Sequence, residues 1–462
     1  MNFSIKPVIT NFILFLMVFS SCKENNTVHL SGELTAAEAN QAILSNGFMN
    51  FIDTINLNNG TLNHTLELSQ PKILTFKVGK QITQLYLTPG SNLAIGYDDK
   101  KKAFTFTGDN ALENTAISDF NRWMTDAERS NPGIQIAAYG EHEFVEILNK
   151  KFRKAQEYLE MQKQNIAPDL YKRLVNRVNQ ASSLDMVRYP TYHKYATMKE
   201  VEMTQGYHEQ INQININDPD LLDFTEGVAL GRAMVEKGID FEKIRSVTKY
   251  YQALVDKVGE TFDNPELKEY FTYSYLRDKI NYGGGIDEIE EQLNSFYSSA
   301  SNNYLVRTLK GEAVKWEDLT RGKEAPDFSG TTRNGDLVKL SDLKGKNVYI
   351  DVWATWCGPC IREIPSLKEV EHDYEDKNVE FVSISIDAAK DYEKWEKFIE
   401  EKDLGGTQLF AANDWKSEVA TSYNIRGIPR FILIDDEGKI VKADAPRPSS
   451  PELRELLSEI GI

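Results

Sequence analysis

"NVYIDVWATWCGPC", residues 347–360, is the stretch that decides the fold of this chain. Its first seven residues are almost all apolar, a run that predicts a strand buried on both faces of a sheet. A short loop then leads to Cys357, and apolar residues recur behind it at helical spacing, at Ile361, Ile364, Leu367 and Val370. We therefore predict a strand, a tight loop and a helix that begins at Cys357.

The two cysteines of this stretch, Cys357 and Cys360, have the spacing of a structural disulfide, half of a metal site or a redox pair. Amide groups at a helix N-terminus lack partners within the helix, and the helix dipole is positive there. Both effects stabilise a thiolate, so cysteine pKa values fall from about 8.5 to roughly 3.5–7.5 at such positions. Cys357 would then attack a substrate disulfide. Cys360, expected to be more buried and to keep its proton, would resolve the mixed disulfide.

The cysteine count favours the redox interpretation. Of three cysteines in the chain, the third, Cys22, lies in a segment with the features of a secretion signal. A disulfide that closes a two-residue loop is a poor structural staple, because loop-closure entropy grows with loop length. A structural zinc site needs four ligands, and the histidines lack ligand spacing: His29, His64, His142, His193, His208 and His372. We expect no metal and no other cofactor.

The N-terminus predicts export and a lipid anchor. Lys6 precedes the apolar run Phe12–Phe19, which is far shorter than the roughly 20 residues that span a bilayer. Small residues directly before Cys22 resemble the lipobox of bacterial lipoproteins, although Phe19 stands where leucine is usual. We expect a signal peptide at 1–21 and a lipidated tether at 22–27. An ordinary signal peptide with an incidental cysteine is the alternative.

Composition limits the number of domains and the kinds of partner. A chain of 462 residues is too long for one core, and 41% hydrophobic residues are ordinary for folded protein. The net charge of −17 argues against nucleic acid and against an anionic membrane surface as partners, since both need a basic footprint. The chain is therefore expected to be a multidomain protein that does not bind nucleic acid.

Two regions precede the cysteine motif. Residues 28–108 alternate in polarity and carry turn signals at Asn59-Gly60 and Pro89-Gly90, which predicts an all-β, sandwich-like domain. Residues 109–320 change to helical spacing and are expected to form an α-helical region. The residues with this spacing are Val145, Leu148, Phe152, Ala155 and Leu159, and again Ile286, Ile289, Leu293 and Phe296.

The last region, residues 321–462, alternates strands and helices. A hairpin is expected at Asn334-Gly335, and buried strands are expected at 379–387 and 430–435. Ser450 before Pro451 suits the N-cap of a final helix.

The cysteine motif and its flanks resemble a known family. "IDVWATWCGPC" resembles the thioredoxin superfamily. Within that superfamily, the flanking motifs resemble those of exported thiol–disulfide oxidoreductases similar to TlpA and ResA. These motifs are "APDFSG" at 325–330, "REIPSL" at 362–367 and "YNIRGIPRFILID" at 423–435. The resemblance covers about residues 321–462 and implies a C-terminal α/β thioredoxin-like fold. The β region also looks like a domain of unknown function found ahead of such domains in Gram-negative lipoproteins, which implies no chemistry.

The resemblance implies roles for individual residues. Asp351 matches the buried acid that handles the proton of the resolving cysteine, and burial should raise the pKa of its carboxyl. Glu363 matches an acid beside the motif in the ResA-like group, with a solvated helix face as the alternative. Pro429 matches the cis-proline that faces the cysteines in this superfamily. The residues expected to contact substrate are those of its loop and the tryptophan before Cys357: Gly427, Ile428, Pro429 and Trp356.

The expected protein is a periplasm-facing, lipid-anchored thiol–disulfide oxidoreductase, with the outer membrane as the expected site of the anchor. "CGPC" resembles the reducing members, so we expect reduction of protein disulfides with an unidentified thiol as electron donor. One alternative is a peroxiredoxin-like thiol peroxidase, because "APDFS" also opens those domains, although Ala354 stands where they carry threonine or serine. The other is a partner-binding lipoprotein with an accessory redox domain.

Overall fold

The computed structural model describes residues 26–34, 39–46, 52–98, 100, 102–239, 244, 246–411 and 413–462. The expected signal peptide and Cys22 lie outside these ranges, as does most of the expected tether, so all three stay predictions. Within the described ranges, no helix combines the length and the apolar character needed to cross a membrane.

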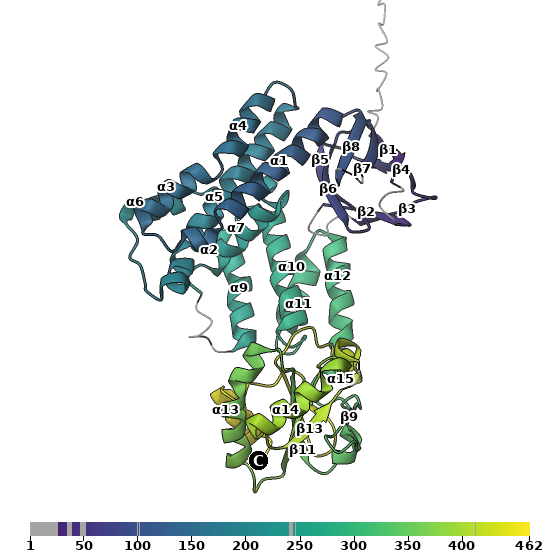
Figure 1. Ribbon diagram of the computed structural model, residues 1–462, viewed down its shortest axis with the longest axis vertical. Helices are drawn as coiled ribbons and strands as arrows, with labels where there is room; N and C mark the ends of the chain where they lie inside the picture. Colours follow the sequence, from purple (N-terminus) through teal and green to yellow (C-terminus); the bar gives the residue numbers. More distant parts are fainter. Residues whose placement is uncertain are drawn as a thin grey trace, which may run out of the picture. The chain divides into compact units, whose positions relative to one another are not determined.

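The chain forms two compact units, which Figure 1 colours along the sequence. One unit contains the described residues up to 44, with 53–121 and 165–167, and the other contains 45–52, 122–164 and 168–462. The second unit therefore holds both the cysteine motif and most of the helices that precede it.

The N-terminal strands form two four-stranded sheets, in agreement with the expected sandwich-like β region. The first has the order β4-β1-β7-β8: β1 (Thr27–Glu33), β4 (Thr61–Glu67), β7 (Asn92–Asp98) and β8 (Ala103–Gly108). The second has the order β3-β2-β5-β6: β2 (Gln41–Ser45), β3 (Ile52–Asn56), β5 (Lys72–Val78) and β6 (Gln81–Leu87).

The turn at Asn59-Gly60 does not join neighbouring strands of one sheet. Both residues have positive φ, 51° and 80°, as a tight primed turn requires, and Asn58 and Thr61 exchange backbone hydrogen bonds of 3.2 and 2.9 Å. However, β3 before the turn and β4 after it belong to different sheets. The dipeptide predicts the local turn correctly, but the pairing of the flanking strands depends on contacts far away in the sequence.

The middle of the chain is helical, as expected. Its elements are α1 (Ala111–Ser130), α2 (Gly133–Ile136), α3 (Glu141–Lys151), α4 (Arg153–Gln162), α5 (Pro168–Thr197), α6 (Gln205–Asn212), η2 (Pro219–Leu222), α7 (Thr225–Glu236), α9 (Val247–Thr261), α10 (Pro265–Tyr282), α11 (Glu290–Ser299), α12 (Asn303–Ala313) and η3 (Val314–Leu319).

Two details of the helical prediction are wrong. The spacing that begins at Val145 predicts one helix, but the helix is interrupted at Phe152, which ends α3 and precedes α4, and the buried residue at its start is Phe144. The second pattern begins at Ile286, whereas α11 begins only at Glu290, after a turn. In both places apolar residues in a turn pack into the core, so helical spacing continues beyond the helix itself.

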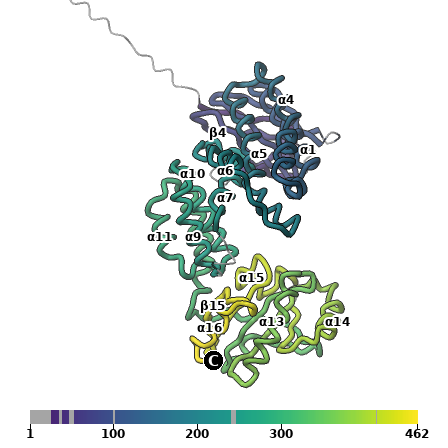
Figure 2. Tube along the Cα trace, turned by 90° about the vertical axis from the view of Figure 1, so that its left-hand side faces the viewer, coloured from purple at the N-terminus to yellow at the C-terminus, as the bar shows by residue number. Residues whose placement is uncertain are grey.

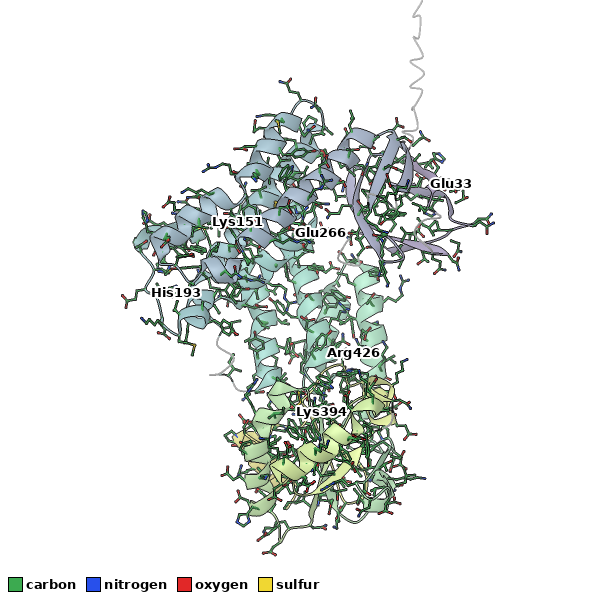
Figure 3. The ribbon with its side chains drawn as sticks, in the orientation of Figure 1. Glu33, Lys151, His193, Glu266, Lys394 and Arg426 are labelled. Atoms are coloured by element: carbon green, nitrogen blue, oxygen red, sulfur yellow. A yellow bond between two sulfur atoms is a disulfide. The ribbon has the colours of Figure 1, made fainter. Side chains whose placement is uncertain are left out.

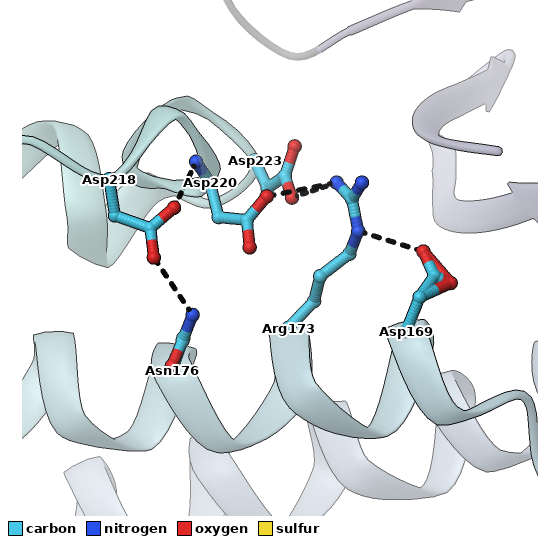
Figure 4. A network of polar contacts seen from close by, with 6 residues as sticks. All are labelled: Asp169, Arg173, Asn176, Asp218, Asp220 and Asp223. Atoms are coloured by element: carbon cyan, nitrogen blue, oxygen red, sulfur yellow. Dashed lines mark hydrogen bonds and ion pairs between the residues drawn. The ribbon is translucent and has the colours of Figure 1, made fainter. Parts of the chain in front are cut away.

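A network of polar contacts fastens η2 to α5 (Figure 4). The Arg173 guanidinium lies 3.4 Å from Asp220 and 2.5 Å from Asp223. Asn176, one turn further along α5, donates to Asp218 at 3.4 Å, and Asp218 also accepts the backbone N–H of Asp220. These contacts connect η2 and its flanking residues to α5.

The C-terminal part is a seven-stranded sheet of order β10-β9-β13-β12-β11-β14-β15, flanked by helices labelled in Figure 2. Its elements are β9 (Ser329–Thr331), β10 (Leu337–Lys339), η4 (Leu340–Leu343), β11 (Asn347–Trp353), α13 (Gly358–Asp373), β12 (Val379–Ser385), η5 (Ala389–Asp391), α14 (Tyr392–Lys402), β13 (Thr407–Phe410), η6 (Asp414–Lys416), α15 (Glu418–Ser422), β14 (Arg430–Ile434), β15 (Ile440–Lys442) and α16 (Pro451–Glu459).

Most local predictions for this part are confirmed. β9 and β10 pair as the hairpin expected around Asn334-Gly335, and every residue of β11 is buried. Ser450 occupies the N-cap position of α16, but its hydroxyl contacts the Glu452 carboxylate rather than a helix amide. The predicted side-chain cap is therefore wrong: the Ser450 hydroxyl donates to the Glu452 carboxylate, and its oxygen accepts no amide of the helix.

Successive residues of β11 point to opposite faces of the sheet. Tyr349 joins an apolar cluster with Leu367 of α13 and Leu453 of α16. Ile350 joins a second cluster on the other face, which includes residues of α14 and α15. By the same alternation Asp351 lies on the face that α13 covers.

The second cluster extends beyond the α/β part. It includes Leu276 of α10, Phe296 of α11, Leu309 of α12 and Trp316 of η3, together with Ile350 of β11. The last helices of the helical region and the central sheet therefore share one hydrophobic core.

Candidate active site

The cysteine motif sits where β11 ends and α13 begins. Cys357 is the N-cap residue of α13, and its Sγ accepts the backbone N–H of Cys360 at 3.2 Å. The two cysteines form a disulfide, with 5.3 Å between their Cα atoms. Each is only 4% exposed, so the expected deeper burial of Cys360 is wrong for the oxidised pair, because the bond holds both sulfurs at the same depth.

The loop before Cys357 is held by a buried aspartate that the motif does not reveal. Asp387 follows β12 and is fully buried. Its carboxylate accepts the backbone N–H and the hydroxyl of Thr355, each at 2.8 Å, and the hydroxyl of Ser385 at 2.8 Å. Hydrogen bonds to a charged acceptor are stronger than neutral ones, so these contacts fix the path of the chain into the motif. The acid that ends "SISID" is the only local sign of this anchor.

Asp351 is the second buried aspartate beside the motif. It is 8% exposed and lies in β11 between Ser383 of β12 and Phe431 of β14. Within the described part of the chain, its Oδ1 atom has no hydrogen-bond partner. Burial raises the pKa of this carboxyl from 3.8 to about 8, and the negative charges of Glu363 and Glu371 add to the shift. The raised pKa expected from the strand is confirmed.

A small cavity connects Asp351 with the motif. It lies between β11, α13 and the chain before β13, and it has a volume of about 10 Å³, near the lower limit for one water. Its lining includes Asp351, Cys360, Lys368 and Glu371, with apolar and neutral polar groups around them. The buried acid and the second cysteine of the motif therefore line the same small cavity.

Glu363 is held by contacts with the segment before α16. Its carboxylate accepts the backbone N–H of Ser449 at 3.1 Å and the hydroxyl of Ser449 at 3.0 Å, and lies 3.7 Å from Arg447. The side chain is 12% exposed, so the alternative of a solvated helix face is wrong. These contacts explain its position without a role in exchange, and that role stays a prediction.

The expected cis-proline loop lies beside the end of β11. The bond between Ile428 and Pro429 is cis, as the resemblance implies. Arg430, which follows, is paired with Val352 near the end of β11, so this loop and the cysteine loop meet at one edge of the sheet. Ile428 packs against the cluster that contains both cysteines, and Gly427 is exposed.

The helical region contacts this same loop. The Arg430 guanidinium pairs with Asp444 at 3.0 Å and lies over the Trp316 ring at 5.7 Å from its centroid. Arg426, labelled in Figure 3, binds Glu312 of α12 at 2.8 Å. Residues of α12 and η3 thus contact Arg426 and Arg430, which flank the cis-proline on either side.

An exposed aromatic pair flanks the motif. Trp356 is 52% exposed and its ring lies 6.2 Å from that of Trp415, which is 39% exposed. Trp356 is the expected apolar surface beside Cys357. Trp415 comes from η6 and could not be connected with the motif from the sequence, although a tryptophan in the polar stretch "ANDWKS" is a signal of an exposed contact residue.

No group of three or more histidine, cysteine or acidic side chains with the arrangement of a metal site occurs among the residues that the structure describes. The motif is a disulfide-bonded cysteine pair beside a buried carboxyl whose pKa is raised.

Comparison with known proteins agrees with this chemistry. The Redoxin family model matches residues 320–457. The chain is 32% identical over 151 residues to the thiol-disulfide oxidoreductase ResA of Bacillus thuringiensis, which covers 33% of this chain and 84% of that protein. It is 32% identical over 126 residues to ResA of Bacillus subtilis, covering 27% and 68%.

Among solved structures, the thioredoxin domain of a thiol-disulfide oxidoreductase from Bacteroides vulgatus is 33% identical and covers 30% of this chain and 96% of its own, with a TM-score of 0.28. The two ResA proteins share about a third of their residues with this chain over two thirds or more of their own lengths. The chain therefore belongs to the ResA-like thiol-disulfide oxidoreductases of the thioredoxin superfamily.

Proposed function

We propose that the protein is an exported, lipid-anchored reductase of protein disulfides, in which Cys357 is the nucleophile and Cys360 the resolving thiol. The observation that carries the proposal is the Cys357–Cys360 disulfide at the start of α13, above a cavity that also holds the buried Asp351. A disulfide between residues this close in sequence does little for stability, whereas a nearby titratable acid is useful for thiol chemistry.

The proposed reaction begins from the reduced pair. The Cys357 thiolate attacks one sulfur of a substrate disulfide, and the other substrate sulfur leaves and takes up a proton. Cys360 then loses its proton, attacks the Cys357 sulfur and releases the second substrate thiol. The substrate gains two electrons and two protons, and the enzyme is left with its disulfide. An unidentified dithiol donor returns both electrons.

Asp351 is proposed to accept the proton of Cys360 in the second step. Both groups line the same cavity, and the pKa of the Asp351 carboxyl is raised to about 8 by burial. An acid with a pKa near the working pH can take up and release a proton without a large free-energy cost. The substrate is proposed to contact the edge formed by Trp356, Gly427, Ile428 and Pro429.

The direction of the reaction can be tested by redox equilibrium. Resemblance of "CGPC" to reducing members supports a potential near that of thioredoxin, about −270 mV, and far below the about −120 mV of a strong oxidant such as DsbA. Equilibration of the full chain with glutathione or dithiothreitol buffers, followed by thiol alkylation, measures this potential. A value near −120 mV would contradict the reductase direction and leave the exchange chemistry intact.

Trapping identifies the substrate. In Cys360→Ala the mixed disulfide on Cys357 cannot be resolved, so substrate proteins stay attached and can be identified after non-reducing electrophoresis. Cys357→Ser is the matched control and should trap none. If both variants still reduced a model protein disulfide at the wild-type rate, the proposal would be wrong.

Lipid attachment at Cys22 is proposed from the N-terminal sequence, with the protein facing the periplasm from the outer membrane. In the native host, Cys22→Ser should move the protein from the membrane to the soluble fraction of the cell envelope. Unchanged membrane association would contradict the anchor without affecting the proposed chemistry.

A further inference from the structure

A second acid, Glu371, lines the cavity behind the cysteine motif. It lies two turns after Glu363 in α13 and is half-buried, whereas Asp351 is almost fully buried. The cavity is therefore bounded by a buried carboxyl, by Cys360 and by a carboxyl that also reaches solvent. A path for a proton from the cysteine to solvent needs groups of these kinds around one cavity.

We infer that Glu371 is the solvent-side end of a proton path that runs from Cys360 through Asp351. When Cys360 attacks the Cys357 sulfur, its S–H proton passes to Asp351 in the molecules whose Asp351 is ionised, about a tenth of them at pH 7 for a pKa of about 8. Asp351 then passes a proton to the Glu371 carboxylate across the cavity, and Glu371 releases it to solvent. The path runs in reverse when the enzyme disulfide is reduced. This inference rests on the proposed function and adds to it the route by which the proton leaves.

The contacts around Glu371 leave its carboxylate able to accept a proton. Lys368, the charged neighbour on the same helix, donates its ammonium to the carbonyl oxygen of Lys402 at 2.7 Å. No hydrogen bond joins the Glu371 carboxylate to another residue in the described ranges, and a Cβ added at Gly405 would lie 2.9 Å from its Oε2. Ser383 and Gln408, which line the cavity from β12 and β13, are neutral.

The charges around the path are compatible with proton exchange near neutral pH. Burial raises the pKa of the Glu371 carboxyl to about 7, although the positive charge of Lys368 lowers it. The pKa of Asp351 is about 8, and the charges of Glu363 and Glu371 contribute to that shift. Two acids with similar pKa values can exchange a proton readily, and the cavity has room for about one water to bridge them.

The test separates the two chemical steps in the reduced full-length protein. Mixed with oxidised glutathione in a stopped-flow instrument, the protein should show a first phase that depends on glutathione concentration, from attack by Cys357. A second, concentration-independent phase reports resolution by Cys360. Glu371→Gln should leave the first phase unchanged and slow the second by about 10- to 100-fold at pH 7. Glu369→Gln, on an exposed position of the same helix, is the matched control.

Small bases distinguish a proton path from a structural role. Imidazole or formate should partly restore the second phase in Glu371→Gln, because a dissolved base can carry the proton instead. Gly405→Ala keeps the charge but displaces the carboxylate, and is expected to slow the same phase less. A second phase within twofold of Glu369→Gln, or a slow phase that is independent of pH and of added base, would overturn the inference. Absence of both phases in the wild type would instead contradict the proposed function.

Discussion

Two buried aspartates lie beside the motif, one in β11 and one directly after the neighbouring strand β12. The two carboxyls differ in the hydrogen bonds that they accept. Asp387 accepts hydrogen bonds from Thr355 and Ser385, so its charge is compensated. Asp351 has an oxygen with no partner in the described structure, and its pKa is raised to about 8. A compensated buried charge holds a loop in place, whereas an uncompensated one is ready to take up a proton.

The largest expected effect is on the pH dependence of stability. Because the pKa of Asp351 is raised from 3.8 to about 8, the folded protein keeps a proton that the unfolded chain releases, so stability falls as pH rises from about 4 to about 8. Asp351→Asn should remove this fall and raise the free energy of unfolding by up to about 4 kcal/mol at pH 7, with little change at pH 4. Urea unfolding of the oxidised protein at several pH values measures it.

The same substitution should slow disulfide exchange, by roughly tenfold or more in the step that Cys360 performs. A variant that is more stable but slower is the signature expected of an uncompensated functional acid. Loss of stability at pH 7 in Asp351→Asn would show that the carboxylate is compensated after all, and the contrast with Asp387 would fail.

Asp387→Ala should change stability in the opposite direction. It leaves the backbone N–H and hydroxyl of Thr355 and the hydroxyl of Ser385 without their acceptor in a fully buried place. We expect a loss of about 3 kcal/mol in the free energy of unfolding, measured by urea denaturation, together with a loss of exchange activity as the loop loosens. Asp376→Ala, at an exposed position after α13, should leave both unchanged. A neutral result at Asp387 would mean that the loop is held by other contacts.

Ser385→Ala tests the same anchor more gently. Its hydroxyl donates to Asp387 at 2.8 Å and accepts the backbone N–H of Asp387 at 3.0 Å. Because the two bonds to Thr355 remain, the expected loss is about 1 kcal/mol, measured in the same unfolding experiment. If Ser385→Ala lost as much free energy of unfolding as Asp387→Ala, the Ser385 hydroxyl would stabilise this loop more than the hydrogen bonds to Thr355 do.

Glu363→Gln should have the smallest effect. Removal of its negative charge should lower the pKa of Asp351 by less than about one unit, since the charge acts over a distance and burial is the larger cause. Carboxyl ¹³C NMR of the oxidised protein can follow that titration, with Glu369→Gln as the control. A shift of two units or more would make Glu363, and not burial, the main reason for the raised pKa.

Much of the motif could be predicted from the sequence because its determinants are local. The apolar run of β11, the start of α13 at Cys357 and the acid at Asp351 all lie within fourteen consecutive residues. Pro429 is 69 residues after Cys360, and its cis bond is predictable only from the family motif that contains it.

Other features depend on residues brought together only by the fold. Asp387, Trp415 and Glu371 come from three separate parts of the chain, and the sequence near each gives no distance to Cys357. The sharing of one core by Trp316 and Ile350 likewise depends on packing, since both are simply apolar residues in the sequence. The break of the helix at Phe152 has no signal in the sequence, because a buried residue between two helices keeps the helical spacing.

The exposed tryptophan beside the disulfide gives the protein its own optical signal. Trp356 is bonded directly to Cys357, and a disulfide is an efficient quencher of excited indole at short range. Four of the six tryptophans, Trp353, Trp356, Trp395 and Trp415, lie in the α/β part that carries the cysteines. Reduction should therefore brighten the emission near Trp356, and the state of the cysteines can be followed in real time in the unlabelled protein.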